Sequence, residues 1–378
     1  MVVDVAIVGA GPGGCAAALE LGKCGLRVAL VDKSIFPRDK VCGDAIPGPA
    51  IKVLHEIDPR YALSLNELPT VQRSRRTRLH LNGHRPVTLH WETVAYTCRR
   101  TDFDHHLLGL VRRYTPTHVR TGSAVEDIDV REDGVVLQMG NGETIRAGGV
   151  IGADGAQSLV GKLLAGHRLD REHHGGAVRQ YYRGVAGLEA DRLEIHSLPD
   201  FMPGYFWIFP LADGGCNVGF GMHSAAITAG RVNLRASIGA FIDASPELRE
   251  RFRGAAPTEA VVGFGLPFGS RRIRVSGNRY LLVGDAASLI DPLTGDGIGQ
   301  AIGSGLLAAR AAATCHAGGN WSDAATAGYG EALHRRYGKM LRTRTRVLDA
   351  HRRWPFLVDW GARLLAIGPV RRMVRPYL

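Results

Sequence analysis

The sequence predicts an α/β protein: a doubly wound, Rossmann-like domain built from three separate segments, an inserted antiparallel sheet, and a helical C-terminal segment. Three observations predict this class. Residues 3–32 run from an apolar strand through a glycine turn and a helix to a second apolar strand, which is one βαβ unit. Residues 71–93 and 175–267 instead show the alternation typical of antiparallel sheets. Residues 279–315 return to a buried strand followed by a long Ala/Gly-rich helix.

These patterns predict the domain boundaries. The dinucleotide-type domain is expected from residues 1–70, 97–170 and 268–323. The inserted sheet is expected from residues 71–96 and 171–267, interrupted by one polar helix near residues 230–253, and a basic helical region from residues 324–378.

The composition is that of an ordinary globular protein, with 45% hydrophobic and 22% charged residues in a chain of 378. The N-terminus begins directly with strand pattern, and no apolar run is long enough to span a bilayer. We therefore expect a cytoplasmic protein. Six cysteines lack the spacing of metal sites, so we expect free thiols and no metal centre: Cys15, Cys24, Cys42, Cys98, Cys216 and Cys315.

The net charge of +11 is concentrated at the C-terminal end. Residues 335–378 hold twelve Lys or Arg and two acidic residues, so the rest of the chain is close to neutral. This distribution argues against a nucleic-acid-binding body. Three interpretations remain open: attachment to an anionic membrane surface, a solvated helix packed on the body, and docking of an acidic electron donor such as ferredoxin.

A glycine-rich turn follows the first strand and opens the first helix. Gly9, Gly11 and Gly14 have the G-x-G-x-x-G spacing that lets backbone approach a pyrophosphate, and Asp32 ends the next strand where an acid can bind ribose hydroxyls. The turn therefore predicts a dinucleotide site, without separating FAD from NAD. The residues expected to line it are Gly9, Gly11, Pro12, Gly13, Gly14, Asp32 and Lys33.

Two later motifs indicate FAD. Residues 152–158 carry an Asp-Gly motif after a strand, and Gly284-Asp285 precedes a Pro/Gly-rich loop at 291–298. In this order the motifs resemble those of the flavoprotein hydroxylase superfamily. The resemblance implies that Asp285 binds the ribityl chain and that the later loop lies beside the pyrimidine edge of the flavin. The implied cofactor residues are Asp154, Gly155, Asp285, Pro292, Gly295, Gly297 and Ile298.

The same resemblance extends to the segment between the motifs. Residues 99–104 match the superfamily's Arg-x-x-Phe-Asp pattern, which implies that Arg100 reaches the cofactor. Ala124 falls where the backbone contacts adenine. One departure is Gly161, which stands where that superfamily commonly has an arginine, so a role attached to that arginine does not carry over.

Two further segments are similar to the geranylgeranyl reductase family. Residues 203–210 and 219–221 resemble its Tyr-x-Trp-x-Phe-Pro and Gly-x-Gly signature, and residues 40–44 resemble its Cys-Gly-Asp/Gly motif near the flavin. The resemblance implies reduction of C=C bonds in isoprenoid chains. The same resemblance implies that Cys42 and Gly43 lie near the flavin. On a strand, Tyr205, Trp207 and Phe209 share one face and are the expected substrate-binding residues, with an aromatic strand in a hydrophobic core as the alternative.

Several functional alternatives remain at this point. Cys42 is the candidate catalytic residue, either as a redox-active thiol or as a small residue packed near the flavin. A flavin monooxygenase or halogenase uses the same scaffold, and a membrane-associated FAD redox sensor acting through Cys42 is a further interpretation. The electron donor is expected to be NAD(P)H or ferredoxin. The sequence does not identify the proton donor, the substrate or the oligomeric state.

Overall fold

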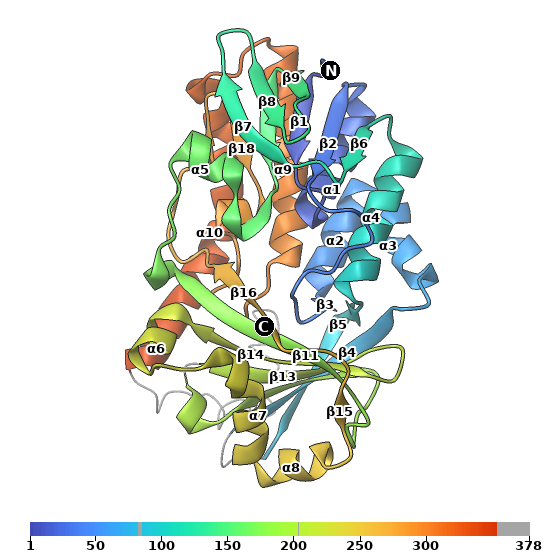
Figure 1. Ribbon diagram of the computed structural model, residues 1–378, viewed down its shortest axis with the longest axis vertical. Helices are drawn as coiled ribbons and strands as arrows, with labels where there is room; N and C mark the ends of the chain where they lie inside the picture. The colour runs from blue at the N-terminus through green and yellow to red at the C-terminus, as the bar shows by residue number, and fades with distance from the viewer. Residues whose placement is uncertain (82–84, 203, 354–378) are drawn as a thin grey trace.

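The computed structural model describes residues 1–81, 85–202 and 204–353 and contains two large sheets stacked along its long axis (Figure 1). The upper sheet carries both the N-terminal βαβ unit and the late strand near residue 280. The lower sheet is formed by the inserted segments. The α/β class with a Rossmann-like domain and an added antiparallel sheet is therefore confirmed.

The Rossmann-like sheet has six strands in the order β17-β18-β10-β1-β2-β6. All neighbours are parallel except β17 and β18, and Val5 of β1 pairs with both Val28 and Gly149. Its strands are nearly continuous apolar runs because both faces are covered. Their bounds are β1 Val5–Val8, β2 Val28–Asp32, β6 His118–Thr121, β10 Gly149–Gly152, β17 Ser276–Gly277 and β18 Tyr280–Leu282.

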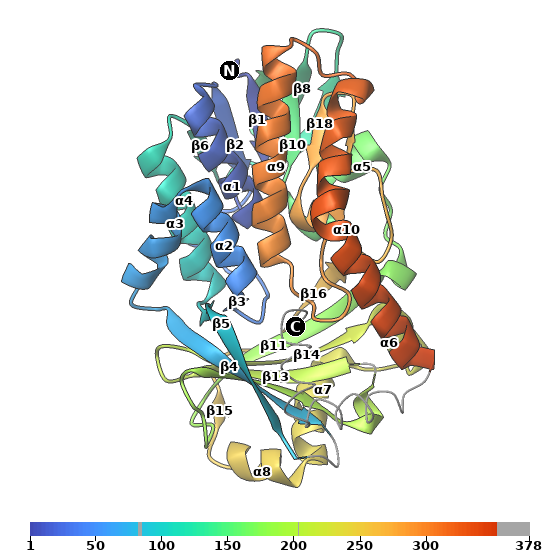
Figure 2. The same ribbon diagram turned by 180° about the vertical axis from the view of Figure 1, so that it is seen from behind.

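Helices cover one face of this sheet and a small three-stranded sheet covers the other (Figures 1 and 2). The central contact on the helical face is between α1 and α9, which glycines allow to approach closely. The helices on and around this domain are α1 Pro12–Leu21, α2 Gly48–Ile57, α3 Pro59–Ser64, α4 Arg100–Tyr114, α5 Leu159–Ala165 and α9 Ile298–Ala317. The small sheet contains β7 Val125–Val130, β8 Val135–Met139 and β9 Thr144–Ala147.

The inserted sheet has nine strands, with β15-β11-β14-β13-β12-β4-β5-β3 in order and β16 paired with β11. Every pairing is antiparallel except β12 with β4, which joins the two inserted segments. The strand bounds are β3 Ala45–Ile46, β4 Gln72–Leu81, β5 Val87–Thr97, β11 His174–Arg183, β12 Arg192–Ser197, β13 Gly204–Pro210, β14 Cys216–His223, β15 Ala256–Pro257 and β16 Val262–Pro267.

One face of the inserted sheet packs on helices and the other faces the Rossmann-like domain. Phe206 and Ile208 of β13 point toward the helical side, where the Phe206 ring stacks on Phe241 with centroids 4.6 Å apart. Trp207 and Phe209 point the opposite way and form a separate apolar cluster. The helices of this part are α6 Ser224–Ala229, α7 Leu234–Ala244 and α8 Pro246–Phe252.

Local predictions and structure differ in two places. Residues 230–253, expected as one polar helix, form two helices because Ser245 and Pro246 begin a new one at α8. Strand β3 lies within the first predicted segment but pairs with β5 of the inserted sheet. The domain boundaries otherwise stay a prediction. Residues 82–84, between β4 and β5 in the sequence, lie outside the described ranges.

The basic region begins as helix α10, Asp323–Arg353, and its remainder lies outside the described residues. Figure 2 shows α10 running beside α9 and then past the Rossmann-like domain toward α6. Tyr329 of α10 donates a hydrogen bond from its hydroxyl to the backbone oxygen of Leu282, which ties the helix to the upper sheet. None of the helices in the described ranges combines the length and apolar character that crossing a bilayer requires.

The approach of α1 and α9 generates the first prediction. A Cβ added at Gly305 would lie 2.1 Å from the backbone oxygen of Gly13, a contact that no rotamer can relieve. We expect Gly305→Ala to lower the free energy of unfolding by at least about 2 kcal/mol in urea titrations. Gly109→Ala is the matched control, because nothing lies within 4 Å of that position in α4. It should raise stability by about 0.5–1 kcal/mol. Equal effects at both positions would contradict the packing described here.

Candidate active site

The three cofactor motifs of the sequence meet around the N-terminus of α1. Gly9 has a φ of +103°, and a Cβ there would lie 2.3 Å from the backbone oxygen of Ala153, next to Asp154-Gly155. A Cβ at Gly13 would lie 3.1 Å from an atom of Val283 and 3.1 Å from an atom of Ala301, which precede and follow Asp285 in the sequence. The glycine turn therefore packs against both later motifs. The structure brings together segments that are more than a hundred residues apart.

Gly11 is different from its neighbours because it faces open space. The nearest group to its added Cβ is Nη2 of Arg38, at 3.7 Å. Gly11 caps α1 without a side-chain hydrogen bond, so the first-turn N–H groups and the positive helix end point toward the same space. Together with Arg38, this cradle has the chemistry that a pyrophosphate requires.

Arg38 belongs to a buried charge cluster. Its Nη1 lies 2.9 Å from Oδ2 of Asp104, which is fully buried. Arg100 donates two hydrogen bonds of 2.7 Å to the same carboxylate. Arg100 was expected to reach the cofactor, but its guanidinium is hydrogen-bonded to Asp104. Arg38 lies closer to the glycine turn.

The adenosine end of the predicted site is built from Asp32 and the loop near Ala124. Asp32 Oδ2 accepts from the backbone N–H of Ala10 at 2.7 Å, which fixes the carboxylate beside the glycine turn. Lys33 is exposed. The carbonyl of Ala124 accepts from Gly140 N at 2.9 Å. Ala124 also borders a pocket of about 690 Å³, lined by residues 119–124, 140, 141 and 143.

The Asp154-Gly155 motif makes a local structural contribution. Asp154 accepts hydrogen bonds from the Ser158 hydroxyl at 2.5 Å and from Val160 N at 3.1 Å, at the start of α5. Gly155 has a φ of +80° with nothing within 4 Å of its added Cβ. The carboxylate thus holds the loop, and the glycine leaves room above it.

The late motif forms the opposite wall. Asp285 lies 3.6 Å from Nζ of Lys40, and its Oδ1 would be 3.4 Å from a Cβ on Gly297. Pro292 and Ile298 are buried, whereas Gly295 and Gly297 are half-buried; a Cβ at Gly295 would meet the Tyr205 hydroxyl of the inserted sheet, and one at Gly297 would meet Ile290. Ile298 begins α9, a helix of 20 residues, so its positive end points at this loop.

The aromatic row of β13 spans the space between this loop and the Cys42 turn. The Tyr205 hydroxyl donates to the backbone oxygen of Thr294, next to Gly295. A Cβ at Gly43 would lie 3.2 Å from the Phe209 ring and 3.4 Å from the Trp207 indole nitrogen. Trp207 and Phe209 are buried and Tyr205 is half-buried. The row therefore lies at the junction of the two sheets, in contact with both loops.

A buried hydrogen-bond network lies beneath the Cys42 turn. Asp44 is fully buried and accepts from the Tyr181 hydroxyl at 2.7 Å and from Asn217 Nδ2 at 2.8 Å. Asn217 also accepts from the Trp207 indole at 2.8 Å and donates to the backbone oxygen of Cys42 at 2.8 Å. One aromatic side chain of the row is thus linked to the turn through two polar residues.

Burial sets the protonation of this turn. It raises the pKa of Asp44 to about 6, despite the opposing hydrogen bonds from Tyr181 and Asn217. The second oxygen of Asp44, Oδ1, is buried without a hydrogen-bond partner, and the residue has a φ of +64°. Burial also raises the pKa of the Cys42 thiol, with Arg100 opposing. A neutral thiol is a poor nucleophile, which weighs against the redox-active interpretation of Cys42.

A second polar cluster lies in the inserted sheet away from these loops. His80, Glu194 and His196 place their ligand-type atoms within 4.8 Å of one another. Glu194, however, accepts from Arg251 at 2.6 Å and from Arg192 at 3.0 Å. These two guanidiniums already balance its charge and would repel a divalent cation, so we interpret the cluster as a structural ion-pair network.

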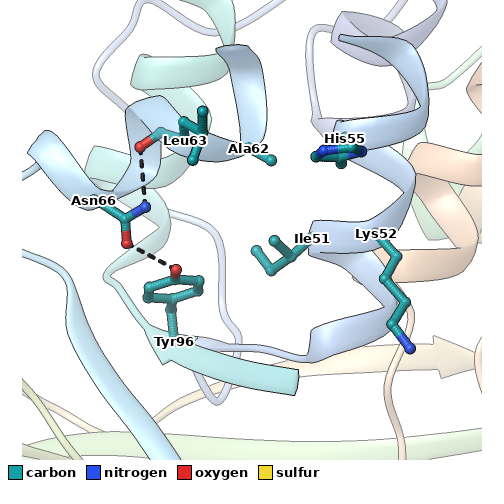
Figure 3. A pocket seen from close by; sticks show the side chains of 7 residues that line it. All are labelled: Ile51, Lys52, His55, Ala62, Leu63, Asn66 and Tyr96. Atoms are coloured by element: carbon teal, nitrogen blue, oxygen red, sulfur yellow. Dashed lines mark hydrogen bonds between the residues drawn. The ribbon is translucent and has the colours of Figure 1, made fainter. Parts of the chain in front are cut away.

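A pocket of about 420 Å³ opens between α2, α3 and β5 (Figure 3). Figure 3 shows Tyr96 on one side of it, with its hydroxyl donating to Asn66 at 2.8 Å. None of the site residues predicted from the sequence lines it; its lining is Ile51, Lys52, His55, Ala62, Leu63, Asn66 and Tyr96.

Sequence reasoning missed four residues that shape the site: Arg38, Asp44, Tyr181 and Asn217. Asp44 stands inside the Cys-Gly-Asp motif, so its position carried a usable signal. Arg38 lies in the irregular loop that follows β2, and only its charge near the glycine turn could have indicated it. Tyr181 and Asn217 reach Asp44 through strand pairing, which local pattern does not reveal.

The network around Asp44 generates the second prediction. The folded protein holds this proton up to about pH 6, whereas the unfolded chain releases it near the ordinary value of 3.8. The contribution of Asp44 to stability is therefore complete below about pH 4 and is lost as the pH rises through 6. At about 1.4 kcal/mol per pH unit, the loss amounts to roughly 3 kcal/mol.

We expect Asp44→Asn, a neutral isostere, to remove this dependence. The variant should match the parent in unfolding free energy near pH 4 and exceed it by up to about 3 kcal/mol at pH 8. Urea titrations at several pH values, with equal FAD present, measure the difference. Asp58→Asn is the control, because the hydrogen bond from Arg60 lowers the pKa of half-buried Asp58 to about 2, so this carboxylate stays charged from pH 4 to pH 8. Parallel pH profiles for Asp44→Asn and the parent would contradict the assignment.

Comparison with known proteins agrees with this geometry. Residues 3–181 match the family model of the pyridine nucleotide-disulphide oxidoreductases. A menaquinone reductase from Mycolicibacterium smegmatis is 32% identical over 323 residues, which cover 81% of this chain and 75% of that protein. A digeranylgeranylglycerophospholipid reductase from Thermoplasma volcanium is 31% identical, covering 81% and 77%.

Solved structures show the same architecture. A geranylgeranyl bacteriochlorophyll reductase-like protein from Thermoplasma acidophilum superposes with a TM-score of 0.79 at 26% identity, covering 92% of this chain and 87% of that one. The flavin-dependent brominase Bmp2 has a TM-score of 0.83 at 20% identity, covering 100% and 93%, and shows the shared fold alone. The sequence relatives and the convergent motifs together show that the chain belongs to the geranylgeranyl reductase family of FAD-dependent oxidoreductases.

Proposed function

We propose that this enzyme reduces C=C bonds in the isoprenoid chain of a lipid. One observation carries the proposal: the aromatic row Tyr205, Trp207 and Phe209 lies between the Cys42–Gly43 turn and the Gly295 loop, and contacts both. Flat apolar side chains in that position suit an isoprenoid chain, which has no polar group of its own near the double bond. The named relatives act on a menaquinone and on a digeranylgeranyl lipid, which supports this substrate class.

FAD is expected to lie along the convergent motifs, and in its reduced state it supplies hydride. In this proposal the cradle at Gly11 and Arg38 holds the pyrophosphate, and Asp32 binds the adenosine ribose. Asp285 binds the ribityl chain, and the positive end of α9 stabilises negative charge on the flavin. Lys40, 3.6 Å from Asp285, adds a second cation to that wall.

The aromatic row would position the substrate and keep water out. Tyr205 is held by its hydrogen bond to Thr294, so its ring is fixed relative to the loop beside the flavin. Burial raises the pKa of Tyr205, which keeps its hydroxyl protonated at neutral pH. The Trp207–Asn217–Asp44 network fixes the next ring of the row relative to the Cys42 turn. The electron donor in this proposal is NAD(P)H or ferredoxin.

A flavin monooxygenase or halogenase is the second candidate, because the motifs at 152–158 and 284–298 resemble those of the flavoprotein hydroxylase superfamily. A redox sensor acting through Cys42 is less well supported, since burial raises the pKa of that thiol and disfavours the reactive thiolate. Oxygen dependence separates the reductase from the monooxygenase.

The reaction class is tested without oxygen. The FAD-loaded protein is reduced with dithionite and mixed with a geranylgeranyl-chain lipid, and a fully saturated analogue is the control. We expect flavin reoxidation and the addition of two hydrogen atoms per reduced bond, seen by mass spectrometry, with the unsaturated lipid alone. Turnover that begins only after air is admitted, with oxygen or halogen in the product, would reject the reductase.

The cradle is tested separately through cofactor affinity. Arg38→Gln should raise the dissociation constant of FAD by roughly tenfold to a hundredfold, since it removes a charged donor facing the pyrophosphate. Arg60→Gln is the matched control, because Arg60 is exposed and pairs with Asp58 at the start of α3. Titration followed by flavin fluorescence measures both. An unchanged dissociation constant of FAD for Arg38→Gln would show that Arg38 does not help to bind the cofactor.

A further inference from the structure

Helix α10 has two chemically different faces. One face packs on the Rossmann-like domain: Leu341 and Leu348 are buried, and a Cβ at Gly303 of α9 would lie 1.8 Å from the Tyr337 hydroxyl. On the same face, Arg344 Nη1 lies 3.0 Å from the buried carboxylate of Asp291. These contacts hold α10 firmly on the body, so its other face is presented in a fixed orientation.

The opposite face carries a row of cations, which we call the α10 stripe: Arg335, Lys339, Arg342 and Arg346. All four residues are exposed. Their spacing of four, three and four residues places them within roughly 60° of one another around the helix, in a row about 16 Å long.

The charge of the α10 stripe is largely uncompensated. At the start of α10, by contrast, Arg272 pairs with Glu331 and Arg274 with Asp323. Within residues 1–81, 85–202 and 204–353, Arg335, Lys339 and Arg346 form no ion pair with an acidic side chain. Arg342 contacts Nε2 of His334 at 2.7 Å. Two acids of the helix flank the row: Glu331, which is paired with Arg272, and Asp349.

We propose that the α10 stripe is the surface by which this enzyme binds an anionic lipid bilayer. A straight row of exposed cations on one rigid helix fits the flat negative surface of such a membrane. Val347 is 49% exposed directly after Arg346, which provides an apolar contact beside the charges. In both views the described part of α10 ends beside α6, near the inserted sheet (Figures 1 and 2).

A bilayer fits these observations better than an acidic protein does. A protein partner usually needs a shaped patch with an apolar centre, whereas the α10 stripe is a narrow line of charge with one apolar neighbour. The sequence after residue 353 is also basic, with Arg363, Arg371, Arg372 and Arg375 against Asp359. Bilayer binding does not depend on the proposed reaction, so vesicles without any isoprenoid substrate can test it.

The test is co-sedimentation of the full-length, FAD-loaded protein with vesicles. We expect binding to phosphatidylcholine vesicles containing 30% phosphatidylglycerol, about tenfold or more above binding to pure phosphatidylcholine, and loss of that binding in high salt. The variant R335Q/K339Q/R342Q/R346Q should lose at least about tenfold in affinity. Its matched control is R112Q/R113Q/R168Q/R249Q, which removes the same charge at four exposed positions on other surfaces and should bind as the parent does.

Each other outcome overturns the proposal. Equal binding to neutral and anionic vesicles would show that apolar side chains insert into the bilayer instead. No binding to either kind of vesicle would show that the protein does not bind a membrane. Equal losses in the two variants would show an effect of net charge alone. Salt-sensitive binding to reduced ferredoxin, with none to the vesicles, would assign the α10 stripe to a protein partner. Far-UV circular dichroism and melting temperatures show whether both variants are folded. The salt series on the unmodified protein tests the charge dependence without any substitution.

Discussion

The structure depends on the close approach of backbone to backbone around helix α1. Gly9 touches the Ala153 carbonyl, Gly14 packs on Gly9, and Gly13 lies against Gly305 of α9. Each contact needs the absence of a Cβ, since a methyl group at Gly14 would lie 1.8 Å from the Gly9 oxygen. Because these contacts join three distant segments, they position the loops proposed to hold FAD, the loop before α9 and, through that loop, the aromatic row.

The inserted sheet serves the site by presenting opposite faces to different environments. Alternate residues of β13 enter the helix-covered core and the junction with the Rossmann-like domain, so one strand both stabilises the sheet and supplies the aromatic row. The junction also buries the carboxyl group of Asp44, which is energetically unfavourable. A carboxylate held away from water is tolerated there because Tyr181 and Asn217 donate to it.

Much of the fold and part of the site were predictable from sequence. The βαβ unit follows from an apolar run, a glycine turn and Asp32, and the parallel strand near residue 280 follows from its short apolar pattern. Arg100 was placed near the site, but its pairing with Asp104, four residues along α4, was not foreseen. The roles of Tyr181 and Asn217 could not be predicted from the sequence, because their positions depend on the register of β11 with β14, in which Tyr181 pairs with Asn217. Helical stripes such as that of α10 follow from spacing once the buried face is known.

The parallel pairing of β4 with β12 joins residues 76–81 to residues 192–197, and β18 enters the upper sheet only after both insertions. During synthesis the β4–β5 hairpin, complete at Thr97, therefore emerges with one long edge unpaired until Arg192 has followed. Neither sheet corresponds to a continuous stretch of the chain, so neither can arise as an autonomous unit from one end of it. Each sheet can therefore be completed only after most of the chain has emerged, because each takes its last strand from beyond residue 260.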